Sequence, residues 1–283
     1  MAKYLSLLFL IFLLLGYSCK TADLRTEELR QDCSDQKALQ LLEEMATAHQ
    51  LDRWENIQTY QIHLTDEFYG LFGKMGNPYP KNRADIELTY IPGTFTGQGV
   101  FKSGKWKDKL WGIQSWRTYE KGEDDKIQFH KKNKKDIEFW LPTYQYFIEL
   151  PMRIREADVF CYAGERKYKD QVYDVVFASW KTASPQKDLD QYLLWINRET
   201  KLLDAVEYTI RDVNKWIKGV LFYEDYREIE GLLIAHQMPV RSFSMDAKKV
   251  LHEIKVLEVA VNTLDRNSLL PNPNLGDPAQ KGQ

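Results

Sequence analysis

Four runs of aromatic and β-branched residues between Gln191 and Val240 constrain the fold more than any other feature. The runs cover 191–197, 202–211, 216–227 and 232–240, and short polar connectors separate them. This spacing is typical of an antiparallel meander, in which consecutive strands pair through tight connections. If 202–211 is extended, alternation gives it one mainly apolar face and one mixed face. We therefore predict a sheet whose apolar face covers something.

Runs of strand-like composition occur along most of the remaining chain. They lie at 57–68, 84–91, 99–101, 110–119, 126–129, 159–162, 172–180 and 250–261. About ten or eleven antiparallel strands with few helices suit a sandwich or a barrel-like sheet. No linker, repeat or break in composition interrupts residues 34–270, so we predict one mainly β (α+β) domain there.

Two helices are expected beside these strands. Ser34 or Asp35 can cap the first, whose apolar stripe runs at helical spacing to His49. The second is short and aromatic, near 142–149. Pro142 is expected at its first position, because proline inside a helix lacks the amide and clashes one turn back.

The aromatic helix places Trp140, Tyr144 and Phe147 on one face. Two interpretations stay open for these side chains. They supply core alone, or they supply core and also one wall of a cavity that binds an apolar ligand.

An export signal begins the chain. Lys3 precedes an apolar run over 5–15, broken only by Ser6, which is too short to cross a hydrocarbon core of roughly 30 Å. Residues 1–18 are therefore predicted to be a signal peptide.

Cys19 directly follows this signal and resembles the acylated cysteine of the bacterial lipobox. Ser18 fits the small residue expected before it, although Gly16 stands where leucine is usual. Lipidation of Cys19 would attach the protein to a membrane, with the polar residues 19–33 as a tether. Ordinary cleavage after Ser18 is the alternative, because Gly16 and Ser18 also satisfy a small-x-small rule.

The other two cysteines, Cys33 and Cys161, could form a disulfide in an oxidising envelope, or stay as unpaired thiols. Sequence cannot place their Cα atoms within bridging distance. The C-terminal residues 271–283 carry three prolines and one large apolar residue, and we expect a disordered tail.

No motif for catalysis, metal binding or a cofactor is present. The five histidines are scattered singly, and neither a nucleophile elbow nor a phosphate-binding glycine loop occurs. The formal charge of −2 gives no reason to expect nucleic acid. We therefore expect no enzyme, no metal and no cofactor.

Several short patterns resemble a group of uncharacterised bacterial envelope lipoproteins. They include Trp140-Leu-Pro142, Glu149-Leu-Pro151, Tyr173-Asp-Val-Val176 and Leu194-Trp-Ile-Asn197. This group is similar in architecture to the outer-membrane lipoprotein carriers, the LolA-like and LolB-like proteins. The resemblance implies a single curved antiparallel sheet forming a half-open barrel. It also implies that helices cover the concave face, which holds acyl chains in the carriers.

Three roles follow for an envelope protein of this kind, on the outer membrane if the resemblance holds. The first is binding of a lipid or acyl chain, with Trp140, Tyr144 and Phe147 lining the cavity. The second is a ligand-free scaffold that binds a protein partner, and the third is an unrecognised hydrolase.

Overall fold

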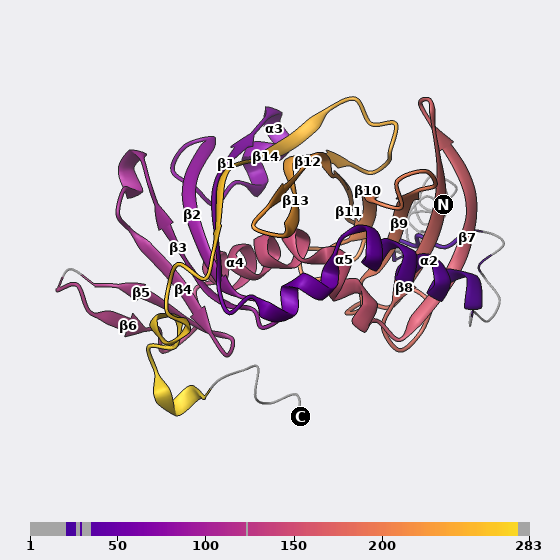
Figure 1. Cartoon of the computed structure of the whole chain (residues 1–283). Coiled ribbons are helices and arrows are strands. Elements are labelled where there is room, and N and C mark those ends of the chain that lie inside the picture. Colours follow the sequence, from indigo (N-terminus) through magenta and orange to yellow (C-terminus); the bar gives the residue numbers. More distant parts are fainter. Residues whose placement is uncertain (1–20, 27–28, 30–34, 123, 277–283) are drawn as a thin grey trace, which may run out of the picture.

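The computed structural model describes residues 21–26, 29, 35–122 and 124–276 (Figure 1). Fourteen strands in this part of the chain form one antiparallel sheet, which confirms the predicted fold class. Its order is β6-β5-β4-β3-β2-β1-β14-β13-β11-β10-β9-β8-β7, and β12 pairs with β13 beside β11. The strands β6 and β7 are the two edges of this path, so the curved sheet is a half-open barrel.

The strand bounds are β1 (Tyr60–Phe68), β2 (Arg83–Ile91), β3 (Thr96–Phe101), β4 (Leu110–Gln114), β5 (Arg117–Lys121), β6 (Ile127–Phe129), β7 (Val159–Tyr168), β8 (Gln171–Ser179), β9 (Gln191–Asn197), β10 (Leu203–Thr209), β11 (Lys218–Phe222), β12 (Glu224–Ile229), β13 (Leu232–Ser242) and β14 (Val250–Val261). The α-helices are α2 (Gln36–Ala48), α3 (Gly70–Gly76), α4 (Lys135–Ile148) and α5 (Leu150–Arg153). Short 3-10 turns are η2 (Leu51–Asn56), η3 (Gly104–Trp106), η4 (Ile154–Glu156), η5 (Arg266–Leu269) and η6 (Pro273–Leu275).

The predicted number of strands is too low, because two predicted runs each divide. Residues 110–119 form β4 and β5, joined at Ser115 and Trp116, which have φ values of 47° and 60°. Positive φ at both central residues is the geometry of a two-residue type I′ hairpin turn, which usually carries asparagine and glycine. The run 216–227 likewise divides at Tyr223, and both halves pair with β13.

Helix α2 forms where the sequence predicted it. The Asp35 carboxylate accepts a hydrogen bond from the Lys37 amide at 2.9 Å and caps the first turn. The buried side chains of α2 include Leu41, Leu42 and Met45, and they pack into the main core.

The start of the aromatic helix was predicted wrongly. Helix α4 begins at Lys135 and continues through Pro142, which leaves the Glu138 carbonyl without an amide donor one turn later. Tertiary contacts offset that loss. Tyr90 donates its hydroxyl to the Leu141 carbonyl at 2.8 Å, and Gln145 donates its side-chain amide to the Ile91 carbonyl at 2.9 Å.

The sheet is covered on both faces. Figure 1 shows α4 crossing the hollow of the curved sheet, and the main core joins its inner side to α2, β1, β2, β13 and β14. A second apolar cluster lies against β7–β11 and includes Leu24, Leu29 and Trp195. All seven residues of β9 are buried between these two clusters.

Residues 271–276, the described part of the tail predicted over 271–283, are bound to the sheet, and residues 277–283 lie outside the described residues. Gln114 and Asn272 exchange two hydrogen bonds, of 2.9 and 3.0 Å, and Ser115 donates to the Leu275 carbonyl. The β4–β5 hairpin therefore binds residues 271–276, because this polar segment finds partners at the end of the sheet.

Candidate functional site

The three residues predicted to line a cavity lie on α4, but their side chains pack against other aromatic rings. Tyr144 is buried, and Trp140 contacts the rings of Phe68 and Tyr144 at centroid distances of 5.6 and 5.7 Å. Phe147 packs on Tyr208 at 4.7 Å. In this conformation the three side chains fill space between the helix and the sheet.

A buried polar cluster around Tyr144 holds α4 to the sheet. The Tyr144 hydroxyl donates to Asp66 Oδ2 at 2.7 Å and lies 2.7 Å from the Tyr79 hydroxyl. His252 Nδ1 contacts the other carboxylate oxygen of Asp66 at 2.8 Å, and its ring stacks on Phe68 at 4.8 Å. The cluster therefore satisfies a fully buried carboxylate and fixes the rotamer of Tyr144.

A second cluster holds the junction of α4 and α5. Arg153 Nε lies 2.7 Å from Glu149 Oε2, and the Tyr60 hydroxyl and Gln145 amide donate to Glu149 Oε1 at 2.8 Å. Burial raises the pKa of Glu149, while the charge of Arg153 and these hydrogen bonds oppose that rise. The Gly93 amide also donates to Glu149, so this carboxylate ties the helix junction to the β2–β3 connection.

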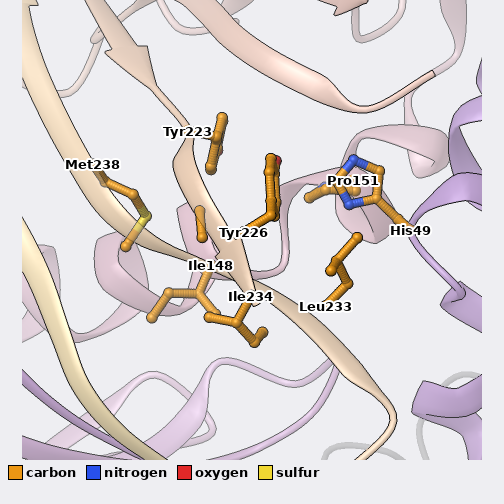
Figure 2. Close-up of a pocket in the computed structure, with 9 residues that line it drawn as sticks. His49, Ile148, Pro151, Tyr223, Tyr226, Leu233, Ile234 and Met238 are labelled. Atoms are coloured by element: carbon orange, nitrogen blue, oxygen red, sulfur yellow. The ribbon is translucent and has the colours of Figure 1, made fainter. Parts of the chain in front are cut away.

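A pocket lies beside this junction, between the end of α2, the α4–α5 segment and the β12–β13 hairpin (Figure 2). Its volume is about 10 Å³, about the space that one water molecule needs. The lining is mainly apolar: His49, Ile148, Pro151, Tyr223, Tyr226, Leu233, Ile234, Ala235 and Met238.

His49 does not give this pocket acid–base character near neutral pH. Burial lowers its pKa to about 4, so the ring is neutral. Its Nε2 accepts a hydrogen bond from the Leu203 amide at 3.0 Å, which places the proton on Nδ1. The ring packs edge-on against Tyr226 at 5.3 Å, so the histidine acts as a packing group.

Sequence reasoning missed this pocket, although it named His49 on the helical stripe. The lining comes from four segments, and neither Tyr226 nor Ala235 carries a local signal for ligand binding. Tyr223 links the pocket to the predicted residues, because its hydroxyl donates to the Phe147 carbonyl at 2.9 Å.

The predicted cysteine sites are only partly within the described residues. Cys161 is disulfide-bonded and buried in β7. Cys19 and Cys33, the other cysteines of the chain, lie outside the described residues, so lipidation of Cys19 and the pairing of Cys33 with Cys161 remain predictions.

Within the described ranges, no cluster of three or more histidine, cysteine or acidic side chains is placed to hold a metal ion. Among the helices of those ranges, none combines the length and apolar character required to cross a bilayer.

Comparison with solved structures identifies the architecture. A LolA superfamily protein from Nitrosomonas europaea aligns with a TM-score of 0.53 and 8% identity, over 82% of this chain and 96% of that one. This chain has the LolA-like fold. A domain from Vibrio parahaemolyticus, whose name assigns it provisionally to outer membrane lipoprotein sorting, aligns with a TM-score of 0.51 and 12% identity, over 84% of this chain and 97% of that one.

A DUF1329 family protein from Desulfovibrio piger also aligns, with a TM-score of 0.51 and 9% identity, over 82% of this chain and 96% of that one. No family model matches the sequence, and no curated protein does. At these identities the LolA-like similarity establishes the fold and leaves the ligand to be argued from the site itself.

Proposed function

We propose that this protein is an exported bacterial lipoprotein, anchored in the cell envelope through Cys19, which binds an apolar ligand without catalysing a reaction. The ligand is a lipid or acyl chain, held between the curved sheet and the α4–α5 segment. The observation that carries the proposal is the small pocket at that junction, which apolar and aromatic residues line together with His49, on the helix-covered face of a LolA-like half-barrel. Apolar walls with a few polar groups are typical of small-molecule sites.

Binding of an acyl chain requires the pocket to enlarge. Its present volume of about 10 Å³ is far below the few hundred cubic ångströms of a ligand site. Met238 is an unbranched side chain that repacks easily, and Ala235 is a small side chain in the same lining. Moving the C-terminal end of α4 away from Tyr223 would break the Tyr223–Phe147 hydrogen bond and expose the ring of Phe147 to the ligand. Exposing Tyr144 and Trp140 as well would also break the hydrogen bond from Tyr144 to Asp66.

The free energy of burying an acyl chain is large enough to offset the opening of the pocket. Each methylene group that moves from water into an apolar site contributes about 0.8 kcal/mol. An eight-carbon segment would thus contribute about 6 kcal/mol, which exceeds the roughly 1 kcal/mol of one neutral hydrogen bond. A chain ligand therefore suits this site better than a small polar one.

Native mass spectrometry of protein purified from envelope extracts without detergent tests the proposal. A bound mass that extraction identifies as a lipid is the expected result. The variant Ala235→Phe, which fills the pocket, should lose that mass. Ala260→Phe, on the half-buried end of β14 and outside the pocket, is the matched control and should keep it.

A ligand-free scaffold for an envelope protein partner is the second candidate. The packing of Trp140, Tyr144 and Phe147 against neighbouring rings favours it. Wild-type protein recovered with no bound lipid, together with no difference in bound mass between Ala235→Phe and Ala260→Phe, would support the scaffold and reject the carrier.

The anchor has a separate test. Mass spectrometry of the mature N-terminal peptide should find Cys19 as the first residue, carrying acyl groups. A mature chain that begins elsewhere, or an unmodified cysteine, would contradict the lipoprotein assignment.

A further inference from the structure

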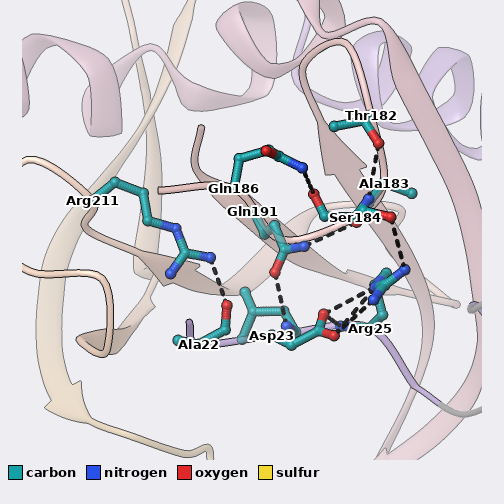
Figure 3. Close-up of polar contacts among 10 residues, drawn as sticks. Ala22, Asp23, Arg25, Thr182, Ala183, Ser184, Gln186, Gln191 and Arg211 are labelled. Atoms are coloured by element: carbon teal, nitrogen blue, oxygen red, sulfur yellow. Dashed lines mark hydrogen bonds and ion pairs between the residues drawn. The ribbon is translucent and has the colours of Figure 1, made fainter. Parts of the chain in front are cut away.

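The first described residues, 21–26, are hydrogen-bonded to the sheet near the β10–β11 connection. The Ala22 amide donates to the Lys215 carbonyl at 2.8 Å, and Arg211 donates to the Ala22 carbonyl at 2.6 Å. The Leu24 amide donates to the buried side chain of Gln191 at 2.9 Å, and Figure 3 shows this contact together with the one from Arg211 to Ala22. The Leu24 side chain is buried in the second apolar cluster.

These contacts fix where the chain leaves the domain. Cys19 precedes Ala22 by three positions in the sequence, and an extended chain spans at most about 3.6 Å per residue. An anchor on Cys19 would therefore attach within roughly 11 Å of Ala22, which is bonded to the β10–β11 connection, residues 210–217. If Cys19 carries acyl chains, this connection is held beside the bilayer surface.

The same connection exposes two apolar side chains. Trp216 is 49% exposed and Val213 is 53% exposed. Tryptophan prefers the membrane–water interface, where its ring meets the acyl region and its N–H meets water.

Neighbouring connections continue this surface along one rim of the sheet. The Phe243 amide, at the start of the β13–β14 connection, donates to the Lys218 carbonyl beside Trp216. At the other end of that connection, the Leu251 carbonyl accepts from the Tyr69 amide, which leads into α3. Antiparallel pairing thus places residues 69–82, 210–217 and 243–249 at the same rim.

Helix α3 carries the most exposed apolar side chains of this rim. Leu71, Phe72 and Met75 are 72%, 72% and 74% exposed. Gly73 seats the helix on β14, because a Cβ atom there would lie 2.2 Å from the Leu251 carbonyl oxygen. The other three side chains are therefore directed to solvent, with Phe243, at 61% exposure, on the adjacent connection.

Basic side chains outnumber acidic ones in these three connections. They are Lys74, Lys81, Lys215, Lys248 and Lys249, against Asp212 and Asp246, with Arg211 buried. A basic rim is attracted to a bilayer that contains anionic phospholipid.

We infer that this rim, formed by α3 and the connections 210–217 and 243–249, docks on the phospholipid surface that holds the anchor. The docked rim sets the orientation of the half-barrel, so the opposite rim, with the β4–β5 turn, faces away from the membrane. This inference rests on lipidation of Cys19 in the proposed function, and is independent of whether the pocket binds a ligand.

A site-specific fluorescent label tests the docking. The full lipoprotein, carrying Trp216→Cys or Phe72→Cys, is labelled with a nitrobenzoxadiazole thiol reagent and reconstituted in phosphatidylethanolamine–phosphatidylglycerol vesicles. Trp116→Cys is the matched control, because Trp116 is 52% exposed at the opposite rim. The unsubstituted lipoprotein, treated with the same reagent, gives the background from native cysteines.

Lipids that carry a nitroxide quencher should remove most of the emission from labels at positions 216 and 72, and little from the label at 116. Equal quenching at all three positions, or stronger quenching at 116, overturns the inference, provided that the variants melt as the unsubstituted protein does. If Cys19 is found to carry no acyl groups, the docking inference is overturned as well, because it requires that anchor. Native mass spectrometry tests separately whether the pocket binds a lipid, so failure of the docking and failure of ligand binding are distinguishable.

Discussion

Replacing Arg153 with methionine should destabilise the protein, because it removes the only cation that contacts the fully buried carboxylate of Glu149 among the described residues. Breaking a buried pair from one side costs about 3–5 kcal/mol. For a domain of this size, each kcal/mol moves Tm by about 2–4 °C. We therefore expect Tm to fall by roughly 10 °C.

The loss of stability in Arg153→Met should also depend on pH. Burial raises the pKa of Glu149, and Arg153→Met removes an opposing charge, so the folded-state pKa rises further. The folded protein then keeps a proton that the unfolded chain releases. Stability from that proton is present below the unfolded-state pKa and is lost as pH rises through the folded-state pKa. The defect should thus be larger at pH 8 than at pH 5.

Thermal and urea unfolding, followed by tryptophan fluorescence at both pH values, measures the effect. Arg155→Met is the matched control, because Arg155 pairs with Glu43 at the surface and should cost under about 1 kcal/mol. Glu149→Gln added to Arg153→Met should recover part of the loss, since it removes the unpaired charge. A variant Arg153→Met as stable as Arg155→Met, or a loss that does not grow with pH, would refute the reasoning.

Two other substitutions test the architecture. Ser115→Asn with Trp116→Gly should stabilise the β4–β5 hairpin by roughly 1 kcal/mol, because asparagine and glycine tolerate the positive φ of this turn; an unchanged or lower urea midpoint contradicts the turn assignment. Gln191→Leu should release residues 21–26 by removing the Leu24 contact, so trypsin should cleave after Arg25 faster than in wild type. Gln186→Leu, on the connection that precedes β9 and without that contact, should leave the cleavage rate unchanged.

Local sequence determined the elements whose signals are themselves local. Alternating aromatic and β-branched residues produced the strands of the 191–240 meander, because a pleated strand presents successive side chains to opposite faces. Asp35 identified the start of α2, since a carboxylate before a helical stripe caps the first free amides.

The tertiary structure decided which local preferences were overridden. Pro142 stays inside α4 because hydrogen bonds from Tyr90 and Gln145 hold the surrounding turns. Trp116 sits at positive φ because the flanking strands pair in register up to Gln114 and Arg117, which leaves two residues for the turn, and type I′ is one of the two favoured forms of such a turn. Neither effect leaves a signal within a few residues of the position.

Long-range packing also decided the candidate site. His49, Ile148, Tyr226 and Ala235 come from four segments, and only the closing of the sheet over α4 brings them together. The apolar rim depends likewise on which strand ends meet, so Phe72 and Trp216 have no recognisable relation in sequence. Sequence fixes which side chains each strand and helix can bury, whereas chain topology decides which of them share a pocket or a surface.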